Sequence, residues 1–240
     1  MEPIENAFHI INLIINDILH TTHSNSYISY ISGSNNFRKQ VDPQYKANRS
    51  DDAKPIHLDT LKEYIMKRHK GVYTDGCEAD DMLGIDQHTN FLKNDGQVDR
   101  CDTVICTIDK DLDMIAGHHY NFVTKEQYWV DEESAAYCFW KQMLTGDRVD
   151  NIFALKGVGP KTAEAYLSEY EQDEWEDAVY VKYQEYFEEE AFTRFRTNYL
   201  LLWIARNEED LHTWQDNEWK ELEVGNDTPR VDIGPLSEVG

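Results

Sequence analysis

The chain has 240 residues, of which 40% are hydrophobic and 12% are aromatic. This composition is sufficient to bury one sizeable core or two small ones, and it excludes a globally disordered chain. The formal net charge of −23 excludes a uniformly basic nucleic-acid-binding surface, so any contact with DNA must be local or mediated by metal ions.

The sequence carries no signal for secretion or for membrane insertion. Its longest apolar stretch, 9–19, is interrupted by Asn12, Asn16 and Asp17 and is too short and too polar to span a bilayer. The first residues carry no positive charge, and the four cysteines lack the spacing of a zinc site or a disulfide framework. We therefore expect a cytoplasmic protein with no membrane partner.

The first half of the chain alternates helical and strand patterns. An apolar stripe predicts a helix over 5–19, and a cluster of Ser, Gly and Asn at 32–36 is expected to form a turn after the first strand. Alternating helices and strands predict an α/β unit with a mostly parallel sheet over 1–131. The expected strands are 27–31, 72–73, 103–108, 120–123 and 128–130.

From residue 132 onward the pattern is helical. Within the acidic run 171–190, apolar residues at helical spacing predict a solvated helix with one buried face. We expect a helical region over 132–223 and an extended tail over 224–240. The expected helices are 135–144, 161–169, 175–187 and 191–205.

Three clusters of acidic residues fall at the boundaries of expected elements. Ligands of an open α/β sheet bind beyond the carboxyl ends of its strands, where two of these clusters are expected to meet. Carboxylates crowded together repel one another unless cations neutralise them, and oxygen-only ligands favour two ions of Mg²⁺ or Mn²⁺. Helix capping is the alternative interpretation of any single cluster. The clusters are Glu78/Asp80/Asp81, Asp109/Asp111/Asp113 and Asp147/Asp150.

The stretch 38–70 reverses the sign of the charge, with nine Lys and Arg residues against five Asp and Glu residues. Tyr45 and Arg49 are spaced to share one helical face, with Lys46 beside them. An aromatic ring among cations can stack a base and neutralise phosphates. The alternative is a solvated basic helix.

A glycine turn, Gly157-Val158-Gly159-Pro160, opens the second expected helix. Exposed N–H groups at a helix N-terminus bind phosphate without reading bases, and Lys156 and Lys161 flank the turn. A plain turn between two helices is the alternative.

Together these motifs resemble those of the bacteriophage 5′→3′ exonucleases and flap endonucleases, which are related to the 5′-nuclease domain of bacterial DNA polymerase I. The motifs appear in the order found in that family and cover about residues 27–167. The matching stretches are Asn36–Lys39, Val41–Arg49, Glu78–Asp81, Thr107–Asp111, Gly146–Asn151 and Gly157–Lys161.

The resemblance implies a PIN-like α/β domain followed by a helix-three-turn-helix, and a monomer that acts on double-stranded or flapped DNA in phage replication or host DNA degradation. It implies that Tyr45, Lys46 and Arg49, with Arg38, steer and polarise the scissile phosphate. The implied metal ligands are Glu78, Asp80, Asp81, Asp109 and Asp111, with Asp147 and Asp150 completing a second site. The expected DNA contacts are Lys39, Lys156, Gly157, Gly159, Lys161 and Thr162, and the resemblance also implies K⁺ at the glycine turn.

The sequence departs from the family at one place. The family usually begins with a hydrophobic strand that ends in a metal-binding aspartate, whereas this sequence starts almost at the first expected helix. We therefore expect an N-terminally shortened PIN-like domain. The alternative function is a cleavage-impaired homologue that binds duplex or branched DNA without cutting it.

Overall fold

The computed structural model describes residues 3–49, 54–94 and 101–215. These residues form two units. The first contains 3–37, 54–94, 101–131 and 204–211, and the second contains 38–49, 132–203 and 212–215. The change from an α/β to a helical pattern falls between Asp131 and Glu132, but 38–49 joins the helical unit and 204–211 joins the α/β unit. The expected tail, 224–240, lies outside the described residues.

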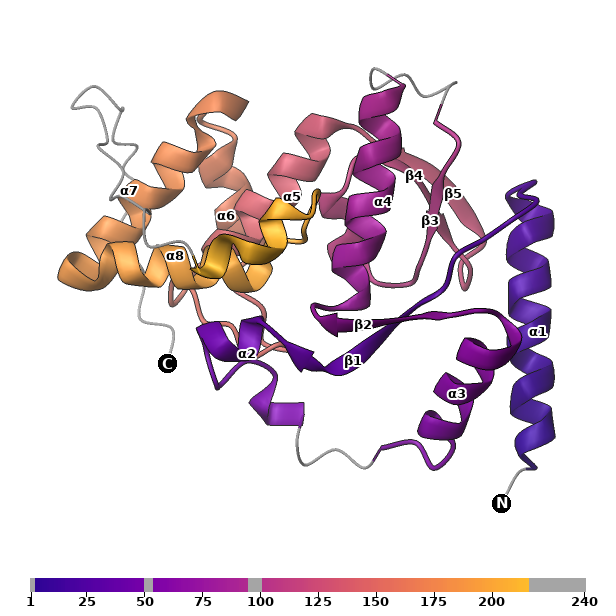
Figure 1. Cartoon of the computed structure of the whole chain (residues 1–240). Helices are drawn as coiled ribbons and strands as arrows, with labels where there is room; N and C mark the ends of the chain where they lie inside the picture. The colour runs from indigo at the N-terminus through magenta and orange to yellow at the C-terminus, as the bar shows by residue number, and fades with distance from the viewer. Residues whose placement is uncertain (1–2, 50–53, 95–100, 216–240) are drawn as a thin grey trace. The chain divides into compact units, whose positions relative to one another are not determined.

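The first unit is a mixed α/β structure with two small sheets (Figure 1). β1 pairs with β2 in parallel, β3 pairs with β4 in parallel, and β4 pairs with β5 antiparallel. The strands that were expected to form one mostly parallel sheet thus form two. The elements of this unit are α1 (Ile4–Thr21), β1 (Tyr30–Asn36), α3 (Leu58–Arg68), β2 (Val72–Gly76), α4 (Ala79–Lys93), β3 (Val104–Cys106), η3 (Lys110–Met114), β4 (Gly117–Asn121) and β5 (Glu126–Val130).

The first strand lies later in the chain than its β-rich residues predict. The stretch 32–36, expected to be a turn, belongs to β1, and its register pairs Ser32 with Thr74 and Asn36 with Gly76. A glycine is required within it, because a Cβ atom at Gly33 would lie 2.4 Å from the Thr74 carbonyl oxygen. Close pairing with β2 therefore overrides the low strand propensity of Ser, Gly and Asn.

The helix α4 contacts strands of both sheets. Gly84 allows the returning segment 204–205 to approach this helix, since a Cβ atom there would lie 2.4 Å from the Ala205 carbonyl oxygen. The apolar core beside it consists of Ile105, Leu112, Ile115 and Ile204, with Leu83 packed against it.

The helix α1 matches the helix expected over 5–19 but buries none of its residues. It packs beside α3, where the Phe8 and Tyr64 rings stack at a centroid distance of 4.1 Å (Figure 1). Asn12 Nδ2 donates to the Tyr64 hydroxyl at 2.9 Å. Among the residues described, no helix is long and apolar enough to cross a membrane.

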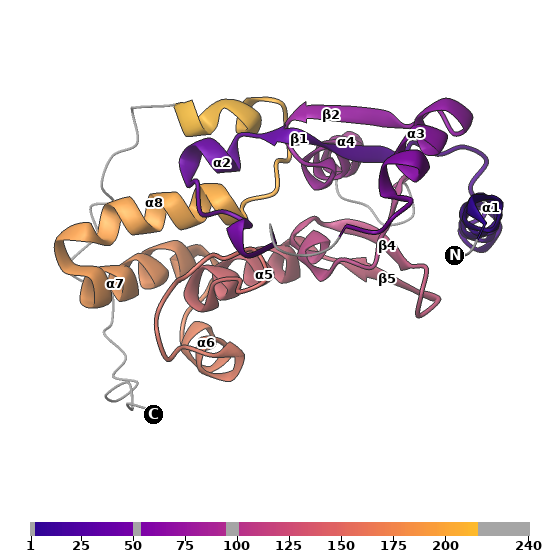
Figure 2. The same cartoon turned by 90° about the horizontal axis from the view of Figure 1, so that it is seen from below.

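The second unit is helical, and α7 and α8 lie side by side within it (Figure 2). Its helix α7 has the bounds expected from the sequence, and three residues of its apolar stripe, Trp175, Val179 and Tyr183, are buried. The helix α8 ends earlier than expected, at Leu202. The elements of this unit are α2 (Arg38–Val41), η1 (Ala47–Arg49), α5 (Glu132–Thr145), α6 (Pro160–Leu167), η4 (Gln172–Glu174), α7 (Trp175–Phe187), η5 (Glu188–Glu190) and α8 (Ala191–Leu202), while η6 (Glu209–Gln215) has residues in both units.

Aromatic rings form the core of the helical unit. Phe195 lies edge-on to both Tyr180 and Tyr183, with centroid distances of 5.1 and 5.4 Å. The buried Tyr183 hydroxyl donates to the Met143 carbonyl at 2.7 Å and accepts from Asn198 Nδ2 at 2.8 Å. A buried tyrosine with both hydrogen bonds made can stabilise the core, because those bonds offset the desolvation of its hydroxyl.

His119 predicts a pH dependence of stability. Its side chain is buried, its Nε2 lies 2.8 Å from the Ile115 carbonyl oxygen, and burial lowers its pKa below the usual 6.5. As the pH falls below 6.5, the unfolded chain binds a proton that the folded chain does not, so the free energy of unfolding falls by up to about 1.4 kcal/mol per pH unit. Urea unfolding at several pH values should show this loss in the wild type and a smaller one in His119→Gln.

The matched control for this prediction is His20→Gln, which alters an exposed histidine of α1. This variant should keep the pH dependence of the wild type. An identical pH dependence in the wild type and in His119→Gln would show that His119 does not titrate as described.

Candidate active site

The first acidic cluster caps α4. β2 ends at Gly76, and Glu78 is the N-cap of the helix, where its carboxylate accepts the Asp81 N–H while the Asp81 carboxylate accepts the Glu78 N–H at 2.9 Å. Asp81 is 0% exposed and also accepts the Ala205 N–H at 3.2 Å. The carboxylate of Asp81 is therefore committed to internal hydrogen bonds, and Asp80, half-buried in the same turn, is the more accessible of the pair.

The second cluster follows β3. Asp109 caps η3, and its Oδ1 accepts the Asp111 N–H at 3.1 Å. Asp109 is exposed and Asp111 is half-buried. Asp113 accepts a hydrogen bond from the Tyr128 hydroxyl at 2.7 Å. The exposed carboxylate of Asp109 is the one in this cluster most accessible to an external ligand.

The third cluster lies in the helical unit, in the turn after α5. Asp147 Oδ1 accepts the Val149 N–H at 2.7 Å and the Asp150 N–H at 3.3 Å, which holds the loop closed. Gly146 has φ +70°, and a Cβ atom there would lie 2.4 Å from the Ile152 carbonyl oxygen, so the turn requires glycine.

Asp150 is surrounded by the basic motif at 44–49. Lys46 Nζ lies 3.3 Å from its Oδ2, Arg49 forms an ion pair with its Oδ1, and the Tyr45 hydroxyl donates to Oδ2 at 3.3 Å. Burial raises the pKa of Asp150, while Lys46 and Arg49 act in the opposite direction. The pKa of Asp150 is raised overall, because burial outweighs the attraction of the two cations.

Backbone contacts join the same two motifs. The Lys46 N–H donates to the Asp150 carbonyl at 2.8 Å, and Lys46 has φ +56°, a left-handed conformation that is uncommon for lysine. Asn48 Nδ2 donates to the Val149 carbonyl at 3.2 Å, and Asn151 Nδ2 donates to the Gln44 carbonyl at 2.7 Å. Sequence reasoning did not identify Asn48 and Asn151 as functional residues, although both lie inside the matching motifs and hold them together.

Two residues expected at the phosphate have buried side chains. Arg38 is 2% exposed, and its guanidinium donates to the Leu201 carbonyl at 3.0 Å and the Trp203 carbonyl at 2.6 Å, where α8 ends. A cation there satisfies terminal carbonyls and complements the helix dipole. Tyr45 is 3% exposed, with Lys46 Nζ 4.8 Å from its ring centroid. Neither group presents an open surface to an incoming strand, whereas Lys39 is exposed.

The glycine turn has the geometry of an open helix N-terminus. Gly157 has φ +86°, Gly159 is the N-cap of α6 with no side chain capping the helix, and Pro160 follows at its first position. Lys156 and Lys161 are exposed on either side, and Thr162 is half-buried. The first N–H groups of α6 therefore have no side-chain acceptor from the N-cap residue.

The candidate ligands are distributed over both units. Within the part of the chain that the structure describes, no three His, Cys, Asp or Glu side chains gather closely enough to hold a metal ion. Five candidates belong to the α/β unit, namely Glu78, Asp80, Asp81, Asp109 and Asp111, and Asp147 and Asp150 belong to the helical unit.

An α/β unit with carboxylates after its parallel strands, followed by a helical region, places this chain in the PIN-like class of folds. The family model of the 5′-3′ exonuclease N-terminal resolvase-like domain matches residues 2–139. The chain belongs to this family.

Individual relatives agree with that assignment. The chain is 30% identical over 148 residues to a DNA polymerase I of Rhizobium leguminosarum, a match that covers 56% of this chain and 14% of the polymerase. It is 30% identical over 137 residues to an exonuclease of Escherichia phage T7, covering 55% of this chain and 44% of that protein. The chain thus matches less than half the length of either relative.

A solved structure shares the fold. The bacteriophage T5 D15 flap endonuclease, in a pseudo-enzyme–product complex with DNA and metal ions, superposes with a TM-score of 0.56 at 18% sequence identity. The match covers 83% of this chain and 79% of that chain. The expected PIN-like α/β fold with a helical region is confirmed.

Proposed function

We propose that the chain is a divalent-metal-dependent 5′→3′ exonuclease or flap endonuclease that hydrolyses phosphodiester bonds in double-stranded or branched DNA. The observation that carries the proposal is the family match over residues 2–139, which includes the carboxylates that follow β2 and β3. The relative from phage T5 was crystallised with DNA and metal ions, which supports the same substrate and cofactor class here.

The donor chemistry fits Mg²⁺ or Mn²⁺. The candidate ligands are all carboxylates, the type that these ions prefer. We assign Asp80, Asp109 and Asp111 as ligands, with Asp147 and Asp150 contributing to a second ion, and we give Glu78 and Asp81 the capping role that their contacts support. A bound divalent ion would polarise a phosphate oxygen and lower the pKa of water.

The chain's own cations have the roles of binding and orienting the substrate. Lys46 is 20% exposed and Arg49 is 45% exposed, so both can contact a phosphate while paired with Asp150. A phosphate bound beside Lys46 and Arg49 would interact with the same two cations as Asp150. These cations would stabilise the negative charge on the scissile phosphate. The open N-terminus of α6, with Lys156 and Lys161, would bind the phosphate backbone of the duplex. A K⁺ ion would bind at the glycine turn.

The test is cleavage of a 5′-labelled duplex that carries a 5′ flap. We expect short labelled products with Mg²⁺ or Mn²⁺, none with EDTA, and restored cleavage when Mg²⁺ is added in excess of EDTA. A matched duplex with a 3′ flap and chemically blocked 5′ ends should stay intact. Cleavage that persists in EDTA would contradict the proposal.

The second candidate is a homologue that binds DNA without cutting it. It is favoured by the absence of a three-carboxylate group within the described part of the chain. A salt-sensitive gel shift of the same flap DNA, with no products at any Mg²⁺ or Mn²⁺ concentration, would favour this candidate over the first.

A further inference from the structure

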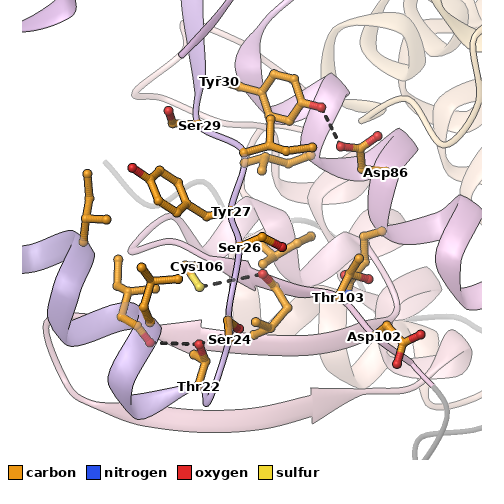
Figure 3. Close-up of a pocket in the computed structure, with 18 residues that line it drawn as sticks. Thr22, Ser24, Ser26, Tyr27, Ser29, Tyr30, Asp86, Asp102, Thr103 and Cys106 are labelled. Atoms are coloured by element: carbon orange, nitrogen blue, oxygen red, sulfur yellow. Dashed lines mark hydrogen bonds between the residues drawn. The ribbon is translucent and has the colours of Figure 1, made fainter. Parts of the chain in front are cut away.

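Two side-chain hydrogen bonds join strand β1 to helix α4. The Ser32 hydroxyl oxygen accepts the Ala79 N–H at 2.9 Å. The Tyr30 hydroxyl donates to Asp86 Oδ2 at 2.5 Å, and Figure 3 shows these two side chains directed toward each other where they line a cavity of the α/β unit. All four residues belong to this unit and are half-buried. The two bonds are therefore partly shielded from competition by water.

The spacing of the four residues matches the periods of the strand and the helix. Tyr30 and Ser32 are two residues apart in a regularly paired part of β1, so their side chains project from the same face of the strand. Ala79 and Asp86 are seven residues apart, which is about two helical turns, so they lie on the same face of α4. One face of the strand thus contacts one face of the helix at two points.

These two contacts fix the position of α4 along its own axis. Ser32 contacts the first residue of the helix, whereas Tyr30, earlier in the strand, contacts a residue two turns later, so α4 runs opposite to β1. Seven helical residues advance about 10 Å and two strand residues advance about 7 Å, and the long tyrosine side chain spans the difference. Sliding or rotating α4 against β1 would break at least one of the two bonds.

The Ser32 contact lies at the turn that carries a candidate metal ligand. Ala79 directly precedes Asp80 and follows the N-cap residue Glu78. The N–H groups of Glu78 and Asp81 donate to side chains within the turn, whereas the Ala79 N–H donates to a side chain of β1. Ser32 therefore connects this turn directly to the sheet. Metal ligands have to be held to within about half an ångström of their binding geometry.

We propose that Ser32 and Tyr30 are positioning residues for the divalent-metal site. By holding α4 in one axial position against β1, they place the Asp80 carboxylate for metal binding. This inference rests on the proposed function, because it takes Asp80 as a ligand. Both residues act through α4, in the way that outer-shell partners orient metal ligands in other proteins, where their loss typically weakens metal affinity or activity by about 10–100-fold.

The first measurement is Mn²⁺ binding to the full chain without DNA, followed by electron paramagnetic resonance of the free ion. For the tightest sites, Ser32→Ala should raise the dissociation constant about tenfold or more, and Tyr30→Phe should raise it several-fold. Ser32→Thr keeps the hydroxyl and should bind Mn²⁺ almost as tightly as the wild type. None of these substitutions changes a charge, so weaker binding would not arise from a loss of electrostatic attraction.

The matched control is Tyr27→Phe. It also removes a tyrosine hydroxyl near the start of β1, but that hydroxyl pairs with His69 Nδ1 at 2.8 Å rather than with α4. This variant should bind Mn²⁺ as the wild type does. Because a single hydrogen bond contributes modestly to stability, all of the single variants should keep the wild-type far-UV circular dichroism and lose at most a few degrees in melting temperature.

A double variant distinguishes one two-point contact from two independent contacts. Losing either bond already allows α4 to shift, so the loss of Mn²⁺ affinity in Ser32→Ala/Tyr30→Phe should be clearly smaller than the product of the two single losses. Two independent contacts would give the full product, which would contradict the proposal.

Asp80→Asn, measured in parallel, separates this proposal from the proposed function. If Asp80→Asn weakens Mn²⁺ binding while Ser32→Ala and Tyr30→Phe bind like the wild type, the positioning role is wrong and the assignment of Asp80 stands. If Asp80→Asn binds Mn²⁺ like the wild type, the ligand assignment and the positioning role both fail. Lower stability of the Ser32 and Tyr30 variants with unchanged Mn²⁺ affinity would show a purely structural role.

Discussion

Asp109→Asn is expected to lower the cleavage rate of a 5′-flap duplex by roughly 10²–10³-fold while leaving the fold and DNA binding intact. In the proposed mechanism Asp109 is a metal ligand, and loss of one charged ligand would remove several kcal/mol of transition-state stabilisation. The fold is spared because Asp109 is exposed and asparagine retains an oxygen to accept the Asp111 N–H. Single-turnover cleavage, gel shift and far-UV circular dichroism measure the three quantities.

The matched control is Asp113→Asn in the same short helix. Asp113 carries the same charge but accepts the Tyr128 hydroxyl, and it is not among the assigned ligands. We expect this variant to cleave at nearly the wild-type rate. Full activity in Asp109→Asn would contradict the proposed role of Asp109 in metal binding. If cleavage persisted in every carboxylate variant, it would come from a contaminating nuclease.

Asp81→Ala is expected to lower the stability of the fold substantially. Asp81→Ala leaves the N–H groups of Glu78 and Ala205 without their acceptor, and each unsatisfied buried group costs about 1–3 kcal/mol. Loss of the capping box adds to this cost, so the free energy of unfolding should fall by about 3–5 kcal/mol. Urea unfolding followed by far-UV circular dichroism is the measurement.

Asp80→Ala is the control, since Asp80 lies in the same helical turn but is half-buried. Its free energy of unfolding should stay within about 1 kcal/mol of the wild type. If Asp81→Ala lowered the free energy of unfolding no more than Asp80→Ala does, the buried hydrogen bonds of Asp81 would not be stabilising the contact between α4 and segment 204–205. Asp81→Asn keeps one acceptor oxygen and should lie between the two.

The elements with strong local patterns were predictable from sequence. The helix α7 has the bounds expected, because its apolar stripe has helical spacing between polar residues. The sequence prediction placed the first strand too early, because Ser, Gly and Asn favour turns. Only the pairing of 32–36 with β2 makes that stretch part of β1. Propensity is a local property, whereas strand pairing depends on a partner about 40 residues away.

In the candidate site, too, local patterns were predictable from the sequence and long-range contacts were not. Sequence patterns identified the acidic clusters, the basic motif and the glycine turn as chemically informative, and family membership follows from them. They did not indicate that the basic motif at 44–49 and the turn at 147–151 are one hydrogen-bonded structure, or that Arg38 caps α8. Partners about 100 or more residues apart leave no local signal.

What the sequence alone determined is the family, the order of helices and most strands, and the residue types available for metal and phosphate chemistry. Only the tertiary structure decided which of those side chains remain accessible. Asp80 and Asp81 are adjacent and chemically identical, yet Asp81 is 0% exposed and holds two backbone N–H groups. Burial and hydrogen-bond partners arise from packing between distant segments, and they distinguish the buried Asp81 from the more accessible Asp80.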